Sequence, residues 1–251
     1  MLKRFCQAAL LAVIGVLSTM CTRPALSQER WSFDSEVLFL QLNTAAGTRA
    51  NDVFGFDTAQ RFSAAFNSRN NVALRFKYFT YDEQGTDPGF STVLLDIYNA
   101  DLEIVKKLNL TNMTSFEFSG GIRYTDADTF FPTAAEPNDF TGFGGIVGIK
   151  GTTRVFTGGD VYARGAFALL TGTAEHDSNR SPNGFVNEAS RTHMELGMGY
   201  QHTFQLRRLT IVPHGGVEWL NLSDYAVDLV DEHPESDMML AGFSFGITAR
   251  F

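Results

Sequence analysis

The sequence has 251 residues, of which 44% are hydrophobic and 13% aromatic, and its 28 Asp and Glu residues outnumber 20 Lys and Arg residues, giving a net charge of −8. This balance excludes a typical nucleic-acid-binding protein, which needs a dense basic surface to displace counterions from phosphate groups. After residue 20 there is no apolar run of about 18 residues, the length that a membrane-spanning helix requires, so a bundle of membrane helices is also excluded.

The first segment has the three parts of a secretory signal peptide. Lys3 and Arg4 give it a positive start, residues 8–17 form a short apolar run, and residues 25–27 match a small-x-small cleavage pattern. We therefore predict a cleaved signal peptide at 1–27.

Cleavage after Ser27 changes the composition of what remains. The mature domain, 28–251, loses three basic residues and no acidic ones, so its net charge falls to −11. It also loses both cysteines, Cys6 and Cys21, which argues against a disulfide-stapled fold. A single anchoring helix in place of the leader and a lipid-modified Cys21 are the alternatives.

The rest of the chain alternates apolar and polar residues in segments of about ten. From Met239 onward the odd positions are apolar, whereas the even positions are mostly small or polar. Within each segment, the charged residues also occupy either the odd or the even positions. A period of two predicts β-strands with one apolar and one polar face.

We predict ten strands, separated by clusters of Gly, Asn, Asp and Pro. They lie at 31–42, 56–67, 71–81, 92–106, 114–125, 140–151, 160–172, 192–204, 208–220 and 239–251. Long connections at 43–55, 82–91, 126–139, 173–191 and 221–238 take turns with short ones at 68–70, 107–113, 152–159 and 205–207. Outer-membrane barrels show this rhythm because tight periplasmic turns alternate with longer extracellular loops.

These features favour an all-β fold, a transmembrane antiparallel up-and-down β-barrel of about ten strands, with eight or twelve strands as alternatives. In such a barrel the apolar face meets lipid, whereas in a soluble β-protein it lines a shared core. A secreted soluble β-barrel that binds an apolar ligand is therefore an alternative. Asp96 is an exception to the alternation, because it occupies an even position, as the apolar-face residues Leu94, Tyr98 and Leu102 do. A bulge or an interfacial position accounts for it.

The end of the chain resembles the assembly signal of outer-membrane barrels, which finish on an aromatic residue preceded by apolar residues at alternate positions. The residues that match are Phe243, Phe245, Ile247 and Phe251. The resemblance implies recognition by the barrel-assembly machinery and location in the bacterial outer membrane. Outer-membrane lipid is then the other expected partner. We expect no binding of nucleic acid, and the oligomeric state is left open.

The charged residues on the polar parity are predicted to line the lumen. They are Asp57, Arg61, Arg75, Lys77, Glu117, Arg123, Glu195, Glu218 and Arg250. Because both signs occur in a confined interior, we expect them to pair with one another. An eight-strand barrel is filled by side chains and sixteen strands leave a wide channel, so ten strands leave at most a narrow path.

Two patterns suggest catalysis. Residues 242–246 match Gly-x-Ser-x-Gly, but a nucleophile elbow needs a strand followed by a helix and a later His, and here the alternation continues through Ser244. Acidic and His residues near the predicted outer rim are Asp82, Glu83, Asp126, Asp128, His176 and His193. They lack a paired spacing that positions a water or a nucleophile, so we predict no catalytic site; a rim-active protease or lipid-modifying hydrolase is the alternative.

The last long connection carries an acidic cluster, which lacks the ordered ligand spacing of a divalent-cation loop. Its members are Asp228, Asp231, Glu232, Glu235 and Asp237. Such a run is more often a solvated surface, so we predict neither a metal site nor a cofactor.

Two glycine-rich segments, 140–148 and 162–172, resemble the Legionella-type major outer membrane protein family. Residues 36–40 and 121–124 support the resemblance, which covers most of the mature chain. It implies a pore-forming outer-membrane barrel. The prediction is therefore a narrow porin-like or structural surface protein with a charged lumen.

Overall fold

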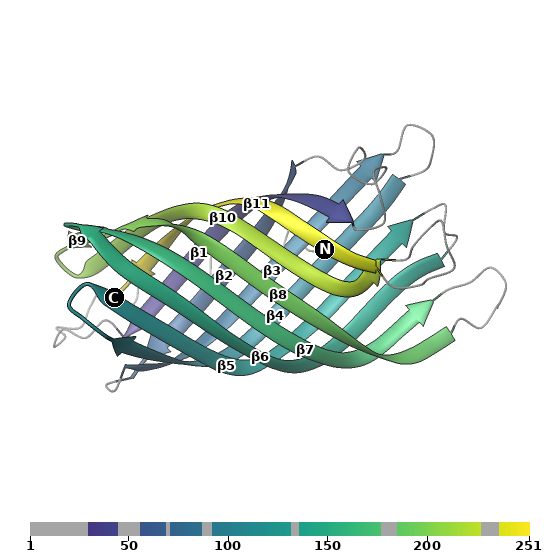
Figure 1. The fold of residues 1–251 in the computed structure, drawn as a ribbon, viewed down its shortest axis with the longest axis horizontal. Coiled ribbons are helices and arrows are strands. Elements are labelled where there is room, and N and C mark those ends of the chain that lie inside the picture. Colours follow the sequence, from purple (N-terminus) through teal and green to yellow (C-terminus); the bar gives the residue numbers. More distant parts are fainter. Residues whose placement is uncertain are drawn as a thin grey trace.

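The protein is described by a computed structural model and is built from β-strands (Figure 1). The described residues are 30–44, 56–68, 71–86, 92–131, 136–176, 185–226 and 236–251. The predicted leader lies outside them. Among these residues, no helix is both long and apolar enough to cross a membrane.

Ten long strands and one short strand follow one another along the chain. They are β1 (Trp31–Thr44), β2 (Phe56–Asn67), β3 (Val72–Thr86), β4 (Thr92–Asn109), β5 (Thr114–Phe131), β6 (Glu136–Phe156), β7 (Gly159–His176), β8 (Phe185–His202), β9 (Phe204–Leu206), β10 (Leu209–Ala226) and β11 (Ser236–Arg250). The short β9 pairs only with the start of β10, so it prolongs the β8–β10 hairpin beyond the wall of the barrel.

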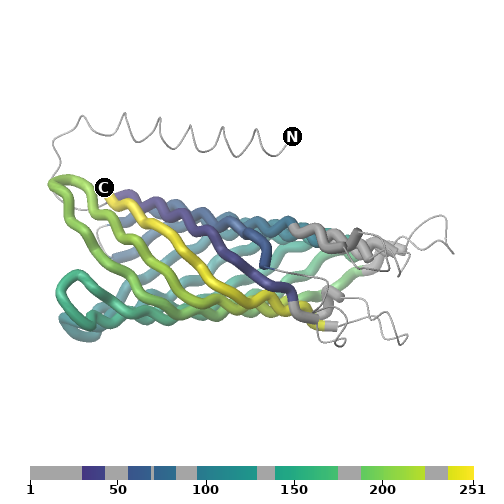
Figure 2. Tube along the Cα trace, turned by 90° about the horizontal axis from the view of Figure 1, so that it is seen from above, coloured from purple at the N-terminus to yellow at the C-terminus, as the bar shows by residue number. Residues whose placement is uncertain are grey.

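The sheet closes on itself because β11 pairs with β10 on one side and with β1 on the other. At the seam, the backbone N–H of Arg30 donates to the carbonyl oxygen of Phe251 at 2.6 Å. Figure 2 shows the purple start of β1 beside the yellow end of β11, at one end of the cylinder. A closed sheet leaves no unpaired edge, which is the condition for crossing hydrocarbon with strands.

The predicted fold class and the ten wall strands are confirmed, but several strands are longer than predicted. Strand β6 has 21 residues, whereas the prediction gave 140–151. Strand β8 begins at Phe185 rather than at residue 192. About 9 to 11 residues cross the bilayer core, so the added residues carry the wall beyond the membrane.

Large apolar side chains cover the outside of the cylinder. Ile122 is 61% exposed, and Phe118, Phe143 and Phe245 also point away from the lumen. An exposed belt of this kind is what lipid solvates. The secreted soluble alternative is wrong, because it required these side chains to form a shared core.

Aromatic residues lie at both ends of this belt. At the end with short turns, the rings of Trp31 and Phe66 are 4.9 Å apart between centroids. At the other end Tyr78, Tyr98 and Tyr124 occupy outward-facing positions on three successive strands. Paired aromatic girdles of this kind mark the two membrane–water interfaces.

Asp96 lies one outward position beyond Tyr98 and therefore outside the membrane-spanning part of β4. Its strand pairs with both neighbours without a register shift, so the predicted bulge is wrong, and the interfacial position stays a prediction that fits this placement. Asp82 and Asp128 are its direct cross-strand partners. Partial burial and these two carboxylates raise the pKa of Asp96 to about 6.

A charge introduced into the outer belt tests the orientation of the wall. Ile122→Lys places an ammonium group among the lipid-facing residues, and we expect it to lower the free energy of unfolding by about 2–4 kcal/mol. Leu110→Lys, on a turn residue that is 66% exposed, is the matched control and should cost little. Urea unfolding from phospholipid vesicles measures both, and equal losses would contradict the assigned belt.

Candidate functional site

The interior of the barrel is divided into three layers along its axis. We call them the apolar plug, toward the ends with the long connections; the ionic layer, in the middle; and the vestibule, at the end with the short turns. By the usual arrangement of such barrels, the plug faces the extracellular side and the vestibule the periplasm.

The apolar plug consists of inward-facing side chains that are almost completely buried. It comprises Leu38, Leu40, Leu42, Ala59, Phe79, Tyr81, Leu95, Ile97, Ala127, Phe140, Ile146, Ala168, Leu170, Ala174, Leu220, Leu222, Met238 and Leu240, with Ala189 packed against it. All ten wall strands contribute to this set. The lumen at this level is therefore a packed core.

This plug differs from the small or polar inward face that alternation predicts. In β1 the inward residues change from Asp34 and Glu36 to Leu38 and Leu40, while Val37 and Phe39 remain outward. Both parities are then apolar, so the period of two disappears from the sequence although the strand continues. A run of this kind is typical of a strand buried on both faces.

The ionic layer is a continuous network of five acidic and five basic side chains. Its members are Arg75, Glu103, Lys77, Asp101, Arg123, Glu195, Arg61, Glu36, Arg164 and Glu218, in the order of their contacts. They come from eight of the ten wall strands. Ser244 of a ninth strand, β11, donates its hydroxyl to Glu218 Oε1 at 3.2 Å.

Two arginines make most of the close contacts in this network. Arg123 donates Nε and Nη2 to the two oxygens of Asp101 at 2.7 and 2.8 Å, and it also donates to Glu195. Arg164 donates to Glu36 at 3.1 Å and to Glu218 at 2.5 Å. Bidentate Arg–carboxylate contacts are strong and fix geometry, so the layer ties opposite walls together.

Glycine makes room for one of these acids. A Cβ atom at Gly197 of β8 would lie 2.9 Å from both carboxylate oxygens of Glu218 on β10. Any larger residue there would displace Glu218 from Arg164. The predicted small inward residues of β8 therefore accommodate the ionic layer.

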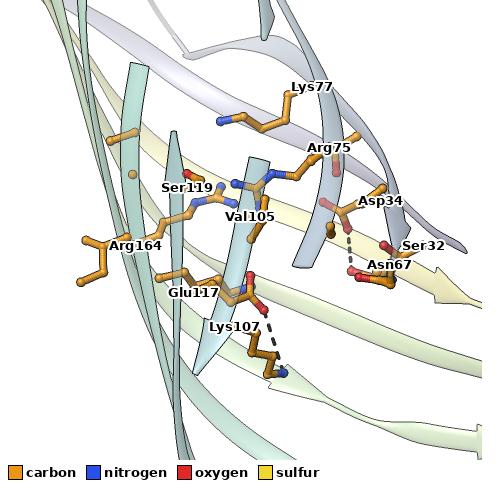
Figure 3. A pocket seen from close by; sticks show the side chains of 18 of the residues that line it. Ser32, Asp34, Asn67, Arg75, Lys77, Val105, Lys107, Glu117, Ser119 and Arg164 are labelled. Atoms are coloured by element: carbon orange, nitrogen blue, oxygen red, sulfur yellow. Dashed lines mark hydrogen bonds and ion pairs between the residues drawn. The ribbon is translucent and has the colours of Figure 1, made fainter. Parts of the chain in front are cut away.

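The vestibule is a cavity of about 400 Å³ that reaches the end of the barrel with the short turns. Ser68 and Asn71 of the β2–β3 turn line its mouth, and Arg61 and Arg164 lie at its inner end. Figure 3 shows Arg75 and Lys77 of β3 and Arg164 of β7 pointing into this space. The cavity ends at the ionic layer.

The structure distributes the predicted lumen residues over these layers. Arg61, Arg75, Lys77, Glu117, Glu195 and Arg250 line the vestibule, and Arg123 and Glu218 lie deeper, in the ionic layer. Asp57 is apart from both, at the outer start of β2, where its carboxylate accepts the backbone N–H of Thr58 at 2.6 Å. Their effect on transport stays a prediction.

Sequence reasoning missed several charged residues of the interior, including Asp34 and Lys107 in the vestibule lining. Glu36, Asp101, Glu103 and Arg164 belong to the ionic layer, and Lys150 points toward the ring of Tyr162, with Nζ 4.8 Å from its centroid. The sequence did contain a signal for Asp101 and Glu103. Both occupy odd positions of β4, on the face opposite to Asp96, and that face is the inward one. Arg164 and Lys150 lie in the glycine-rich strands, where alternation is blurred.

Of the described catalytic candidates, Asp82 and Asp128 flank Asp96 on the outer wall, but His193 does not meet them. His193 is 1% exposed inside the barrel, 3.5 Å from Nη1 of Arg123, whereas Asp82 and Asp126 lie on the outer wall. Ser244 is a buried strand residue bonded to Glu218. The side chains of Glu83 and His176, and the acidic cluster apart from Asp237, lie outside the described residues.

Within the part of the chain that the structure describes, one group of potential metal ligands occurs inside the barrel. Asp34, Glu36 and His214 bring ligand atoms within 4.8 Å of one another. His214 already contacts Asp34 through Nε2 at 2.9 Å and Glu36 through Nδ1 at 3.4 Å, and Arg61 and Arg164 also bind Glu36. These contacts already occupy the two carboxylates, so the group forms part of the lumen network.

A closed antiparallel cylinder with an apolar exterior and aromatic rows at both ends defines a β-barrel protein of the bacterial outer membrane. The chain belongs to the family described as Legionella pneumophila major outer membrane protein precursor, which matches residues 22–251. The predicted family and localisation are confirmed. None of the curated proteins matches the sequence.

One solved structure with a TM-score above 0.5 shows the same kind of fold, and two further solved structures are less similar. The outer membrane protease OmpT from Escherichia coli is 9% identical, with a TM-score of 0.55, and the match covers 92% of this chain and 99% of that one. Neisserial surface protein A is 6% identical over 88% and 97%, with a TM-score of 0.40. The Pseudomonas putida toluene transporter TodX is 9% identical over 90% of each chain, with a TM-score of 0.33. At these identities the similarity extends to the fold alone.

Removal of one arginine tests the ionic layer. Arg123→Met leaves the buried Asp101 and Glu195 without their guanidinium partner, and we expect the free energy of unfolding to fall by about 3–5 kcal/mol. Acidification should reduce this deficit, because a protonated carboxyl no longer needs a cation. Urea titrations at several pH values measure it.

Arg154→Met is the matched control. Arg154 is 54% exposed and pairs with Asp160 at 3.5 Å, so its loss should change stability by less than about 1 kcal/mol. A similar cost for both variants, independent of pH, would contradict the role given to the ionic layer.

Proposed function

We propose that this protein is a structural outer-membrane barrel without catalytic activity, and that its lumen is closed to ion flow in the conformation described. The observation that carries the proposal is the apolar plug. Side chains from all ten wall strands meet there, and those of Leu38, Leu40 and Leu240 are 0% exposed. Hydrated ions need a wet path, and such a packed layer has none.

The ionic layer supports the same conclusion. Ions crossing it would have to separate pairs such as Arg123–Asp101, both of which are 3% exposed. Separation leaves buried charges without partners, which is strongly unfavourable. Two different kinds of closure therefore lie in series between the vestibule and the outer side.

A narrow porin-like activity is the second candidate, and the vestibule is the observation that favours it. About 400 Å³ of the lumen is already open at the inner end. Conduction then requires rearrangement of both the plug and the ionic layer. Because such a rearrangement must open both a packed apolar layer and buried ion pairs, we rank this function second.

The proposal also includes export and assembly of the chain, as the sequence predicts them. Residues 1–27 would direct the chain across the inner membrane, and 28–251 would form the barrel. Phe243, Phe245 and Ile247 face outward on β11, where they are at least half exposed, and Phe251 ends the seam. That placement makes them available to the barrel-assembly machinery before β1 and β11 pair.

Electrical recording from planar bilayers tests closure. Folded protein, verified by a different gel migration of unboiled and boiled samples, is expected to insert without giving discrete current steps. Silence then reflects a filled lumen, because the gel shift excludes a failure to fold. Reproducible unitary steps from the same sample would contradict the proposal and identify a porin-like protein.

A further inference from the structure

In several ion pairs beside the vestibule, the basic side chain faces the cavity and its acidic partner is buried in the wall. In the pairs Arg75–Glu103, Lys77–Asp101 and Arg164–Glu36, the basic side chains are 18–24% exposed, whereas the acidic ones are 1–3% exposed. The ionic layer is neutral as a whole. Its exposed side, which forms the inner wall of the vestibule, is basic.

Two further cations in the vestibule have no carboxylate of their own. Neither Lys150 nor Arg250 forms an ion pair with any described residue, and both line the cavity. Arg75 uses Nε and Nη2 on Glu103, so its Nη1 atom makes no ion pair within the described chain. These groups can bind a ligand without breaking an existing pair.

Acidic groups are fewer in the same lining. They are Asp34, Glu117 and Glu195, against Arg61, Arg75, Lys77, Lys107, Lys150, Arg164 and Arg250. Asp34 accepts from Thr248 at 2.7 Å and contacts His214, Glu195 pairs with Arg123, and Glu117 lies 3.9 Å from Lys107. Basic side chains therefore dominate the surface that a solute entering from the periplasmic side would meet.

We infer that the vestibule is a binding site for a small phosphate-bearing solute of the periplasm. Guanidinium and ammonium groups are the usual protein ligands of phosphate oxygens, and two arginines, Arg75 and Arg164, converge with Lys77 at the inner end (Figure 3). A concave site with walls of low dielectric raises the local concentration of the oppositely charged solute by about tenfold or more. The cavity is larger than inorganic phosphate, so a small phosphate ester also fits.

Thiol labelling of protein comprising residues 28–251 tests the site, because this part of the sequence contains no cysteine. Ser119→Cys puts a thiol in the vestibule lining, and Asn112→Cys puts one on an exposed periplasmic turn. We expect a sulfonate-bearing methanethiosulfonate to react with Cys at 119 about tenfold faster than a trimethylammonium-bearing one, relative to the ratio at 112. Inorganic phosphate should slow labelling at 119 by several-fold, compared with chloride at equal ionic strength.

The unpaired cations provide the matched variants. Lys150→Gln with Arg250→Gln, in the Ser119→Cys background, should reduce both the charge preference and the phosphate protection by several-fold without removing a member of an ion pair. Lys106→Gln, at an outward-facing position of β4, should change neither. Equal reagent ratios at 119 and 112 would overturn the inference. A charge preference without phosphate protection would also overturn it, since it shows attraction without binding.

This inference is independent of whether the lumen conducts. Current steps in the bilayer experiment would end the proposal of closure while leaving the labelling result unchanged. A loss of phosphate protection would remove the binding site and leave the closed barrel intact.

Discussion

The structure depends on one constraint, the need of every backbone N–H and C=O group in hydrocarbon to find a partner within the protein. An open sheet has two edges that lipid cannot satisfy. Here the pairing of β1 with β11 removes both edges, and hydrogen bonds at Arg30 and Phe251 continue that seam to the end of the chain. Closure brings Arg30 and Phe251 together and encloses an interior of fixed circumference.

That enclosed interior is filled in two ways. Toward the outer side it contains a packed apolar cluster, in which Leu38, Leu40 and Leu240 have no exposure. In the middle it contains a neutral network of charged pairs, in which Glu36, Asp101 and Glu103 are 1–3% exposed. The side chains of the apolar plug need no hydrogen-bond or ion-pair partner, whereas the ionic layer is stable only if each charged group keeps its counter-ion. Together they leave space in the inner part of the lumen.

Much of the wall was predictable because strand periodicity is local. The outward rows around Phe118 and Phe245, the charged inward parity at Arg61, Arg75 and Arg123, and the alternation of short and long links follow directly from residue order. Strand ends were less predictable. Beyond the lipid belt the outward residues become polar, as at Asp96, so no change in pattern marks where pairing stops.

The interior was less predictable for two physical reasons. A strand that is apolar on both faces, such as residues 37–40, loses the period of two. The sequence pattern therefore does not reveal the apolar plug. Charge partners come from distant parts of the sequence, as Glu36 and Arg164 do, because strand order and register decide which inward residues meet. The vestibule depends on both effects, since its basic surface exists only when the acids are turned away from it.

The most direct test of the account is to measure which apolar side chains touch lipid. Ile146 and Val147 are adjacent in β6, yet their exposures are 1% and 60%. In protein with labelled Ile, Leu and Val methyl groups in lipid particles, nuclear Overhauser contacts from the acyl chains should reach Val147 and Ile122 and be absent at Ile146 and Leu240. Acyl-chain contacts at Ile146 and Leu240, with none at Val147 and Ile122, would contradict it.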